Sequence, residues 1–234
     1  MSFTPYHSFS SEPKFVRLIE RLNEENKIPT EIYEGFCRYH PALTHKLRST
    51  KYNLEQVKNK LTTTDIQEAA NTKGNFLFET NMFIDGYFYN CGSALDILAH
   101  EVLLIFNQTF PSKVYFETAY KEIHRNRSGD TILTRLTRPT WKQEFSNYRN
   151  ALTHELILAA SYSINIENTG ARQSHMIVFP LPDDPRSSRG TRTYQRNANV
   201  LEYAEENFTR VLRLINGIYS ELYNRTRDND SLPL

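Results

Sequence analysis

Two side chains that could act together on a phosphodiester lie five residues apart in this chain, Arg149 and His154. A histidine side chain has a pKa of about 6.5 and can therefore accept and donate protons under physiological conditions. Arginine stays charged and can neutralise the negative charge that develops on phosphoryl oxygens. RNA carries its own nucleophile, because each ribose 2′-hydroxyl lies beside the phosphate that it can attack. The pair therefore has the side chains needed to cleave RNA without a metal ion, and Asn150 could hold the imidazole or the phosphate by a hydrogen bond.

The spacing of apolar residues places this pair on a helix over residues 141–158. One buried stripe at three- and four-residue steps is formed by Trp141, Phe145, Tyr148, Leu152 and Leu156. At about 100° per residue, Arg149 lies roughly 60° from the centre of the stripe, whereas Asn150 and His154 point roughly 160° away from it. A histidine that points away from the core is either solvated or faces a substrate or a second chain.

The plain alternative is that His154 is only a solvated residue on a helix surface. The spacing of an arginine and a histidine by four to six residues also arises by chance, and a second match runs from Arg38 to His45. Pro41 lies between these two residues and is expected to end a helix there. We therefore expect no shared helical geometry for the second pair.

The sequence Arg149-Asn150-Ala-Leu-Thr-His154 resembles the Arg-polar-x-x-x-His signature of HEPN domains, which are helical bundles found in prokaryotic toxins, antiviral systems and some eukaryotic RNases. Apolar residues between Phe145 and Tyr148 lead into the motif. The segment Ser93–Glu101 is similar to the hydrophobic helix that packs beside the motif helix, and Val178–Arg186 is similar to one branch of the family. The resemblance covers residues 75–224.

The resemblance implies an all-α, up-and-down helical bundle that acts as a metal-independent endoribonuclease and needs no cofactor. Its products would be a 2′,3′-cyclic phosphate and a free 5′-hydroxyl. A homodimer is implied, with a composite site that holds Arg149, Asn150 and His154 of both chains. A toxin or antiviral defence effector, restrained by an antitoxin such as a nucleotidyltransferase-like protein, is typical of the family. The alternative is a non-catalytic, dimeric HEPN-like module that binds RNA or a partner protein, since the family includes members without activity.

Composition narrows the class of protein. With 39% hydrophobic residues, a chain of 234 residues can bury a single sizeable core. Cys37 and Cys91 show no paired spacing and form no Cys/His cluster, which argues against a disulfide framework and structural zinc. The first residues do not resemble a signal peptide, and no apolar run reaches the roughly 18 residues of a membrane span. We therefore expect a cytoplasmic protein without a metal or membrane association.

The formal net charge is only +1, but arginines gather after Pro185. No acidic residue lies between positions 185 and 198, where the basic and aromatic residues are Arg186, Arg189, Arg192, Tyr194 and Arg196. Guanidinium groups donate to phosphate and a tyrosine offers a stacking face, so this segment is a candidate RNA-binding loop if it comes near His154. The alternative is a solvated loop.

The remaining polar residues of note are predicted to have packing or capping roles rather than catalytic ones. His100 and Glu101 are expected to be hydrogen-bonded packing residues within an apolar helix. Asp85 belongs to no metal-ligand spacing that we recognise. Asp183 and Asp184 precede a proline and are expected to cap a loop.

Periodicity and turn residues predict mainly helices. We expect them at Glu12–Asn26, Thr30–Tyr39, Asn53–Leu61, Asp65–Asn71, Phe76–Gln108, Val114–His124, in the motif segment and at residues 201–222. A polar connection is expected at 125–138, a hairpin within 162–179, and a kink or close helix approach at Gly86 and Gly92. The predicted division is an N-terminal helical extension at 1–72, a bundle at 73–226 with an insertion at 160–198, and a disordered tail at 227–234.

Overall fold

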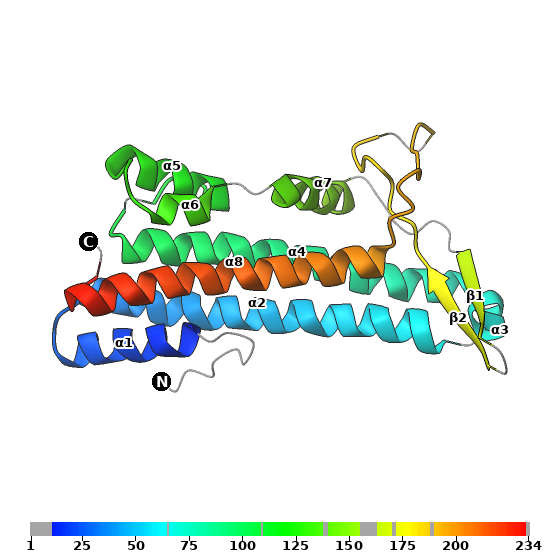
Figure 1. Ribbon diagram of the computed structural model, residues 1–234, viewed down its shortest axis with the longest axis horizontal. Coiled ribbons are helices and arrows are strands. Elements are labelled where there is room, and N and C mark those ends of the chain that lie inside the picture. Colours follow the sequence, from blue (N-terminus) through cyan, green and yellow to red (C-terminus); the bar gives the residue numbers. More distant parts are fainter. Residues whose placement is uncertain are drawn as a thin grey trace. The chain divides into compact units, whose positions relative to one another are not determined.

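The protein is an all-α helical bundle with one small hairpin (Figure 1). The computed structural model describes residues 11–64, 66–108, 110–137, 140–154, 163–169, 172–187 and 190–232. Within these ranges the helices are α1 (Glu12–Glu24), α2 (Thr30–Thr63), α3 (Ile66–Asn71), α4 (Lys73–Ile105), α5 (Phe116–Asn126), α6 (Ile132–Leu136), α7 (Thr140–His154) and α8 (Val200–Asn229). The strands are β1 (Ser163–Thr169) and β2 (Arg172–Val178). The prediction of a helical bundle with a hairpin and loop before the last helix is confirmed.

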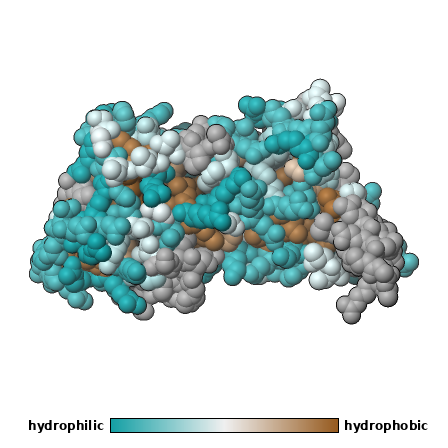
Figure 2. Space-filling view, viewed as in Figure 1, coloured by the Kyte–Doolittle hydropathy of each residue, from teal (hydrophilic) through white to brown (hydrophobic). Residues whose placement is uncertain are grey.

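The surface is largely polar on the face seen in Figure 2, where hydrophobic residues appear mainly in narrow seams. No helix in the described ranges combines the length and apolar character that a bilayer crossing requires.

Contacts divide the chain into two compact units, and α2, α4 and α8 each contribute one part to both. The first unit contains Met1–Arg48, Cys91–Pro139 and Thr209–Leu234, and the second contains Ser49–Asn90 and Thr140–Phe208. The division into an extension, a bundle and a tail stays a prediction. Near the predicted tail, α8 continues to Asn229 and Leu232 is buried.

The first unit has an aromatic core. The ring of Phe15 in α1 lies 6.0 Å from that of Phe36 in α2 and 5.8 Å from that of Tyr219 in α8, measured between centroids. Gly35 allows α2 to approach α4, because a Cβ at this position would lie 2.7 Å from Cδ2 of Leu104.

A buried polar cluster lies within this core, and we call Glu12, His40, Glu101 and Tyr219 the His40 network. Nε2 of His40 lies 3.1 Å from Glu12 Oε1, and Nδ1 lies 3.1 Å from Glu101 Oε1. Tyr219 donates its hydroxyl to Glu101 Oε2 at 2.9 Å. All four side chains are almost completely buried. The prediction that Glu101 is a hydrogen-bonded packing residue is confirmed.

The neighbouring His100 differs from that prediction. Its ring packs against those of Tyr39 and Phe110, with centroid distances of 5.0 Å and 5.6 Å, and these two rings lie 6.3 Å from each other. Within the described part of the chain its Nδ1 is buried without a hydrogen-bond partner. His100 is therefore held by ring packing, and burial lowers its pKa.

Helix α2 is continuous through Pro41, contrary to the two shorter helices expected at Thr30–Tyr39 and Asn53–Leu61. Proline removes one backbone hydrogen bond, but burial on both sides of it offsets that loss. Phe36 precedes Pro41 and Leu43 follows it, and both are buried. Arg38 and His45 therefore do share a helix, both are exposed, and their spacing puts them on one face about 10 Å apart along the axis.

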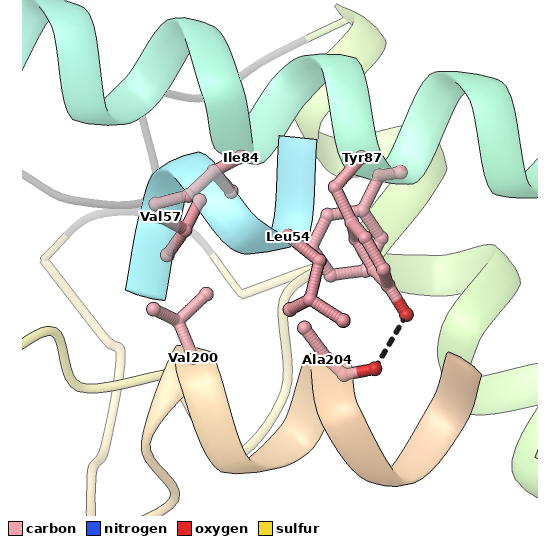
Figure 3. Close-up of a pocket in the computed structure, with 7 residues that line it drawn as sticks. Leu54, Val57, Ile84, Tyr87, Val200 and Ala204 are labelled. Carbon is pink, nitrogen blue, oxygen red and sulfur yellow. Dashed lines mark hydrogen bonds between the residues drawn. The ribbon is translucent and has the colours of Figure 1, made fainter. Parts of the chain in front are cut away.

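In the second unit, side chains of α2, α4 and α8 meet around a small gap (Figure 3). It is lined by Leu54, Val57, Ile84, Tyr87, Phe88, Val200 and Ala204. The gap measures about 10 Å³ and has no polar lining, so it is a packing void rather than a ligand site. Tyr87 places its polar end outside the void and donates its hydroxyl to the carbonyl of Ala204 at 2.7 Å (Figure 3).

Gly86 brings α4 close to α2 in the same unit. A Cβ on Gly86 would lie 2.6 Å from Oδ1 of Asn53, and that amide is held by a hydrogen bond from its Nδ2 to the carbonyl of Ser49. The close approach expected at this glycine is confirmed.

The insertion begins with the predicted hairpin. Strands β1 and β2 are antiparallel, with Ile164 paired to Ile177 and Ile166 paired to His175. Beyond β2, Val200 donates its backbone N–H to the carbonyl of Phe179 at 2.9 Å, which returns the loop to the start of α8. The loop is therefore anchored at both of its ends.

The connection expected at 125–138 also contains a helix. Helix α6 is only five residues long, and its Ile132, Leu133 and Leu136 are buried. Periodicity cannot identify such a short segment, because a single turn gives too few apolar positions.

Candidate functional site

Helix α7 carries the candidate catalytic residues and is fixed by its aromatic side chains. Phe145 stacks on Phe88 of α4 with 5.3 Å between ring centroids, and Tyr148 lies 4.9 Å from Tyr203 of α8. Phe145, Tyr148 and Ala151 are buried. This face agrees with the apolar stripe that the sequence predicts.

The motif residues Arg149 and Asn150 differ in exposure on α7. Asn150 is exposed and Arg149 is half-buried, as their distances from the apolar stripe predict. His154 is the last described residue of α7, and its side chain and residues 155–158 of the predicted helix lie outside the described residues. On a regular helix, residues five positions apart are separated by about 140° around the axis. Helical geometry therefore predicts that Arg149 and His154 point in different directions, although one helix carries both.

The loop after the hairpin is organised by Asp183. Its Oδ2 accepts from the Thr193 hydroxyl at 2.6 Å and from the Gln195 backbone N–H at 2.9 Å, and its Oδ1 accepts from the Arg196 backbone N–H at 2.9 Å. The hydrogen bond from Thr193, followed by that from the backbone of Arg196, lowers the pKa of Asp183. The prediction that Asp183 and Asp184 cap a loop agrees with these contacts.

Arg196 ties this loop to α7. Its Nη1 donates to Glu144 Oε1 at 2.7 Å, and its Nη2 donates to the Asp183 carbonyl at 2.8 Å and to the Tyr148 hydroxyl at 3.2 Å. Tyr148 in turn donates its hydroxyl to the carbonyl of Pro182 at 2.5 Å. Burial raises the pKa of Tyr148 to about 12, so its hydroxyl stays protonated and remains a donor at neutral pH.

The remaining residues of the candidate RNA-binding loop differ in their surroundings. Arg186 is exposed and donates Nε and Nη2 to the two carboxylate oxygens of Asp184, each at 3.0 Å. Arg192 is half-buried and donates Nε to the Ser187 carbonyl at 3.2 Å. Tyr194 is 39% exposed, and Arg189 lies outside the described residues.

Residues 185–198 contain no acidic residue, but Arg186 and Arg196 of this segment pair with acidic residues that lie outside it. Asp183 and Asp184 directly precede this segment, and Glu144 comes from α7, more than 50 positions before Arg196. The positive charges of Arg186 and Arg196 are therefore partly balanced within the protein. A wider window would have found the two aspartates, but only the fold brings Glu144 to the loop.

A hollow of about 400 Å³ opens beside α7. Its lining comes from Asp85, Gly86, Phe88 and Tyr89 of α4 and from Leu152 of α7. Burial raises the pKa of Asp85 to about 6, although the side chain keeps access to solvent. In the sequence Asp85 fits no metal-ligand spacing, and periodicity gives no other signal for it.

The described residues contain no group of three or more His, Cys, Asp and Glu side chains that could hold a metal ion. The His40 network does contain one histidine and two glutamates, but these side chains are buried and hydrogen-bond within the network. It therefore forms part of the core rather than a substrate site.

Comparisons of the chain with protein-family models, curated proteins and solved structures give no match.

Proposed function

We propose that the protein is a metal-independent endoribonuclease of the HEPN type, acting in the cytoplasm as a toxin or antiviral defence effector. The observation that carries this proposal is helix α7, which holds Arg149, Asn150 and His154 in sequence while Asn150 faces solvent. Phe145 and Tyr148 anchor the opposite face, so the helix is a rigid support for these residues.

The chemistry follows from the three residue types. His154 takes the proton of the 2′-hydroxyl, whose oxygen attacks the adjacent phosphorus. The O2′–P bond forms as the P–O5′ bond breaks, and the leaving oxygen receives a proton. Arg149 neutralises the charge on the phosphoryl oxygens, and Asn150 holds the phosphate or imidazole by a hydrogen bond. The products are a 2′,3′-cyclic phosphate and a free 5′-hydroxyl.

A homodimer would supply a second histidine and a second arginine to the site. One histidine cannot be base and acid at the same moment, and helical geometry predicts that Arg149 and His154 point in different directions. A two-fold pairing of α7 with its copy would bring two arginines and two histidines to one groove. The same unit offers an apolar contact surface on α4, where Phe78 is 66% exposed and Met82 is 54% exposed.

In this proposal RNA reaches the loop after the hairpin through Arg186, Arg189, Arg192, Tyr194 and Arg196. Tyr194 offers an exposed ring for stacking. The bidentate pairing with Asp184 uses Nε and Nη2 of Arg186 and leaves Nη1 to donate to a phosphate. Arg196 ties the loop to α7 through Glu144.

A second candidate is a non-catalytic dimeric module of the same family that binds a partner protein, such as a nucleotidyltransferase-like antitoxin. The pairing of Arg186 and Arg196 with carboxylates favours it, because paired guanidinium groups attract phosphate less strongly. Growth on expression distinguishes the two candidates. The endoribonuclease should arrest growth and His154→Ala should relieve the arrest, whereas equal growth of both strains favours the binding module.

The direct test is incubation of the purified protein with mixed RNA in EDTA. We expect cleavage by the wild type and its loss in Arg149→Ala. The matched control is Arg38→Ala, which removes an exposed arginine from the other Arg and His pair. Cleavage that survives in Arg149→Ala but disappears in Arg38→Ala would transfer the activity to α2 and overturn the proposal.

A further inference from the structure

The hollow beside α7 has the size of a small-ligand site. Its volume of about 400 Å³ falls within the roughly 300–1,000 Å³ of small-molecule sites. Leu152 belongs to its lining and lies between Arg149 and His154 in α7. A group bound in the hollow would therefore lie next to the helix that carries the candidate catalytic residues.

Asp85 gives the hollow its polar character. Across the part of the chain that the structure describes, no hydrogen bond or ion pair engages its carboxylate. The raised pKa of about 6 still leaves Asp85 ionised at neutral pH. An ionised carboxylate is an acceptor only, and its two oxygens match a ligand with two adjacent N–H donors.

Aromatic residues supply a surface for a flat ligand. Tyr89 lines the hollow and its side chain is 55% exposed. Phe88 also lines it, and its ring is fixed by stacking on Phe145. Bases of single-stranded RNA stack on such rings and are identified by hydrogen bonds on their Watson–Crick edges.

Among the four RNA bases, only guanine presents two adjacent donors on this edge, N1–H and the N2 amino group. Adenine and cytosine each place an amino donor beside a ring acceptor, and uracil flanks its N3–H with two carbonyl oxygens. A carboxylate therefore selects guanine, because each other base would place an acceptor against one of its oxygens.

We propose that the hollow binds a guanine base of the RNA, with Asp85 accepting from N1–H and N2–H and with Tyr89 stacking on the base. This inference rests on the proposed function and adds a base preference to it. A guanosine held beside Leu152 fixes the register of the RNA, so cleavage falls at a constant distance from a guanosine.

Binding of uncleavable RNA tests the site separately from catalysis. The probes are 2′-O-methyl oligouridylates that carry one central guanosine, one inosine or no purine, and the readout is fluorescence anisotropy. We expect roughly tenfold or tighter binding of the guanosine probe, with inosine in between because it lacks the N2 amino group. Asp85→Asn should remove this difference, because an amide offers one donor and one acceptor.

The matched control is Glu79→Gln, which neutralises an exposed carboxylate of α4 outside the hollow. It should retain the guanosine preference, and Tyr89→Leu should weaken all probes by removing the stacking ring. Melting curves verify that Asp85→Asn is folded. Equal affinities of the wild type for all probes, or a preference that persists in Asp85→Asn, would overturn the inference.

Two further outcomes separate this inference from the proposed function. Cleavage of RNA without guanosine-selective binding would overturn the base site alone. Guanosine-selective binding that depends on Asp85, in a protein that never cleaves RNA, would support the base site while the proposed activity fails. Binding of an arginine-containing peptide that depends on Asp85, without guanosine selectivity, would assign the hollow to a protein partner and overturn the inference.

Discussion

Raising the pH from about 6 to about 10 is expected to destabilise the first unit through the His40 network. The imidazolium of His40 lies between the buried carboxylates of Glu12 and Glu101 and beside the hydroxyl of Tyr219. When His40 loses its proton, the two carboxylates face a neutral ring. The folded state then loses an attraction that the unfolded chain never had.

The size of the effect follows from the pKa of His40. Burial alone lowers this pKa, but the charge of Glu101 and the hydrogen bonds to Glu101 and Glu12 outweigh burial and raise it from 6.5 to about 9. Because the folded pKa lies above the unfolded one, the stabilisation is fully present below pH 6.5 and is lost as the pH rises through about 9. This difference corresponds to about 3 kcal/mol of unfolding free energy.

Tyr219 does not titrate in this window. Burial, followed by the charge of Glu101, raises its pKa well above 10. Its hydroxyl therefore continues to donate to Glu101 while His40 changes charge.

The assay is chemical unfolding at several pH values and constant ionic strength, followed by circular dichroism. The His40→Gln variant removes the titrating group and should flatten the dependence. Glu12→Gln removes one carboxylate and should move the fall to lower pH. An NMR titration of the His40 ring gives the folded pKa directly. A stability that is constant between pH 6.5 and 9, or a fall of equal size in His40→Gln, would refute the reasoning.

Two further perturbations test the packing around the candidate site. Arg196→Ala should free the loop after the hairpin and speed its limited proteolysis severalfold, whereas Arg186→Ala, which breaks only an exposed ion pair, should leave the rate near that of the wild type. Equal rates in both variants would show that Arg196 does not anchor the loop. Gly86→Ala should lower the unfolding free energy by about 1–3 kcal/mol, because the added Cβ meets Asn53. Combining it with Asn53→Ala should recover part of this loss, and no recovery would mean that the contact is not the cause.

Long apolar patterns predicted the main elements. Helices α4 and α8 follow stripes of many turns, and the hairpin follows an alternating pattern with turn residues. Predictions from local sequence were wrong at Pro41, where burial holds the helix together, and at α6, which is very short. Pro41 lies inside α2 because buried residues on both sides hold the helix together, and α6 is too short to have a detectable period.

The candidate site was predictable in part. The helical spacing placed Asn150 on the exposed face of α7 and Tyr148 on the buried face, because both depend on one element alone. The pairing of Arg196 with Glu144 and the placing of Asp85 beside Leu152 depend on contacts between elements far apart in the chain. No local pattern encodes such contacts.

Attack by the 2′-hydroxyl under the control of Arg149 and His154 is the central step of the proposed reaction. The most direct measurement uses an RNA with one mapped cleavage site, in EDTA, beside the same RNA carrying a single 2′-deoxyribose immediately 5′ to that site. We predict that the all-ribose strand yields a 2′,3′-cyclic phosphate and a free 5′-hydroxyl, and that the substituted strand stays intact at that position. Cleavage of the substituted position, or cleavage that requires added magnesium, would contradict the proposed mechanism.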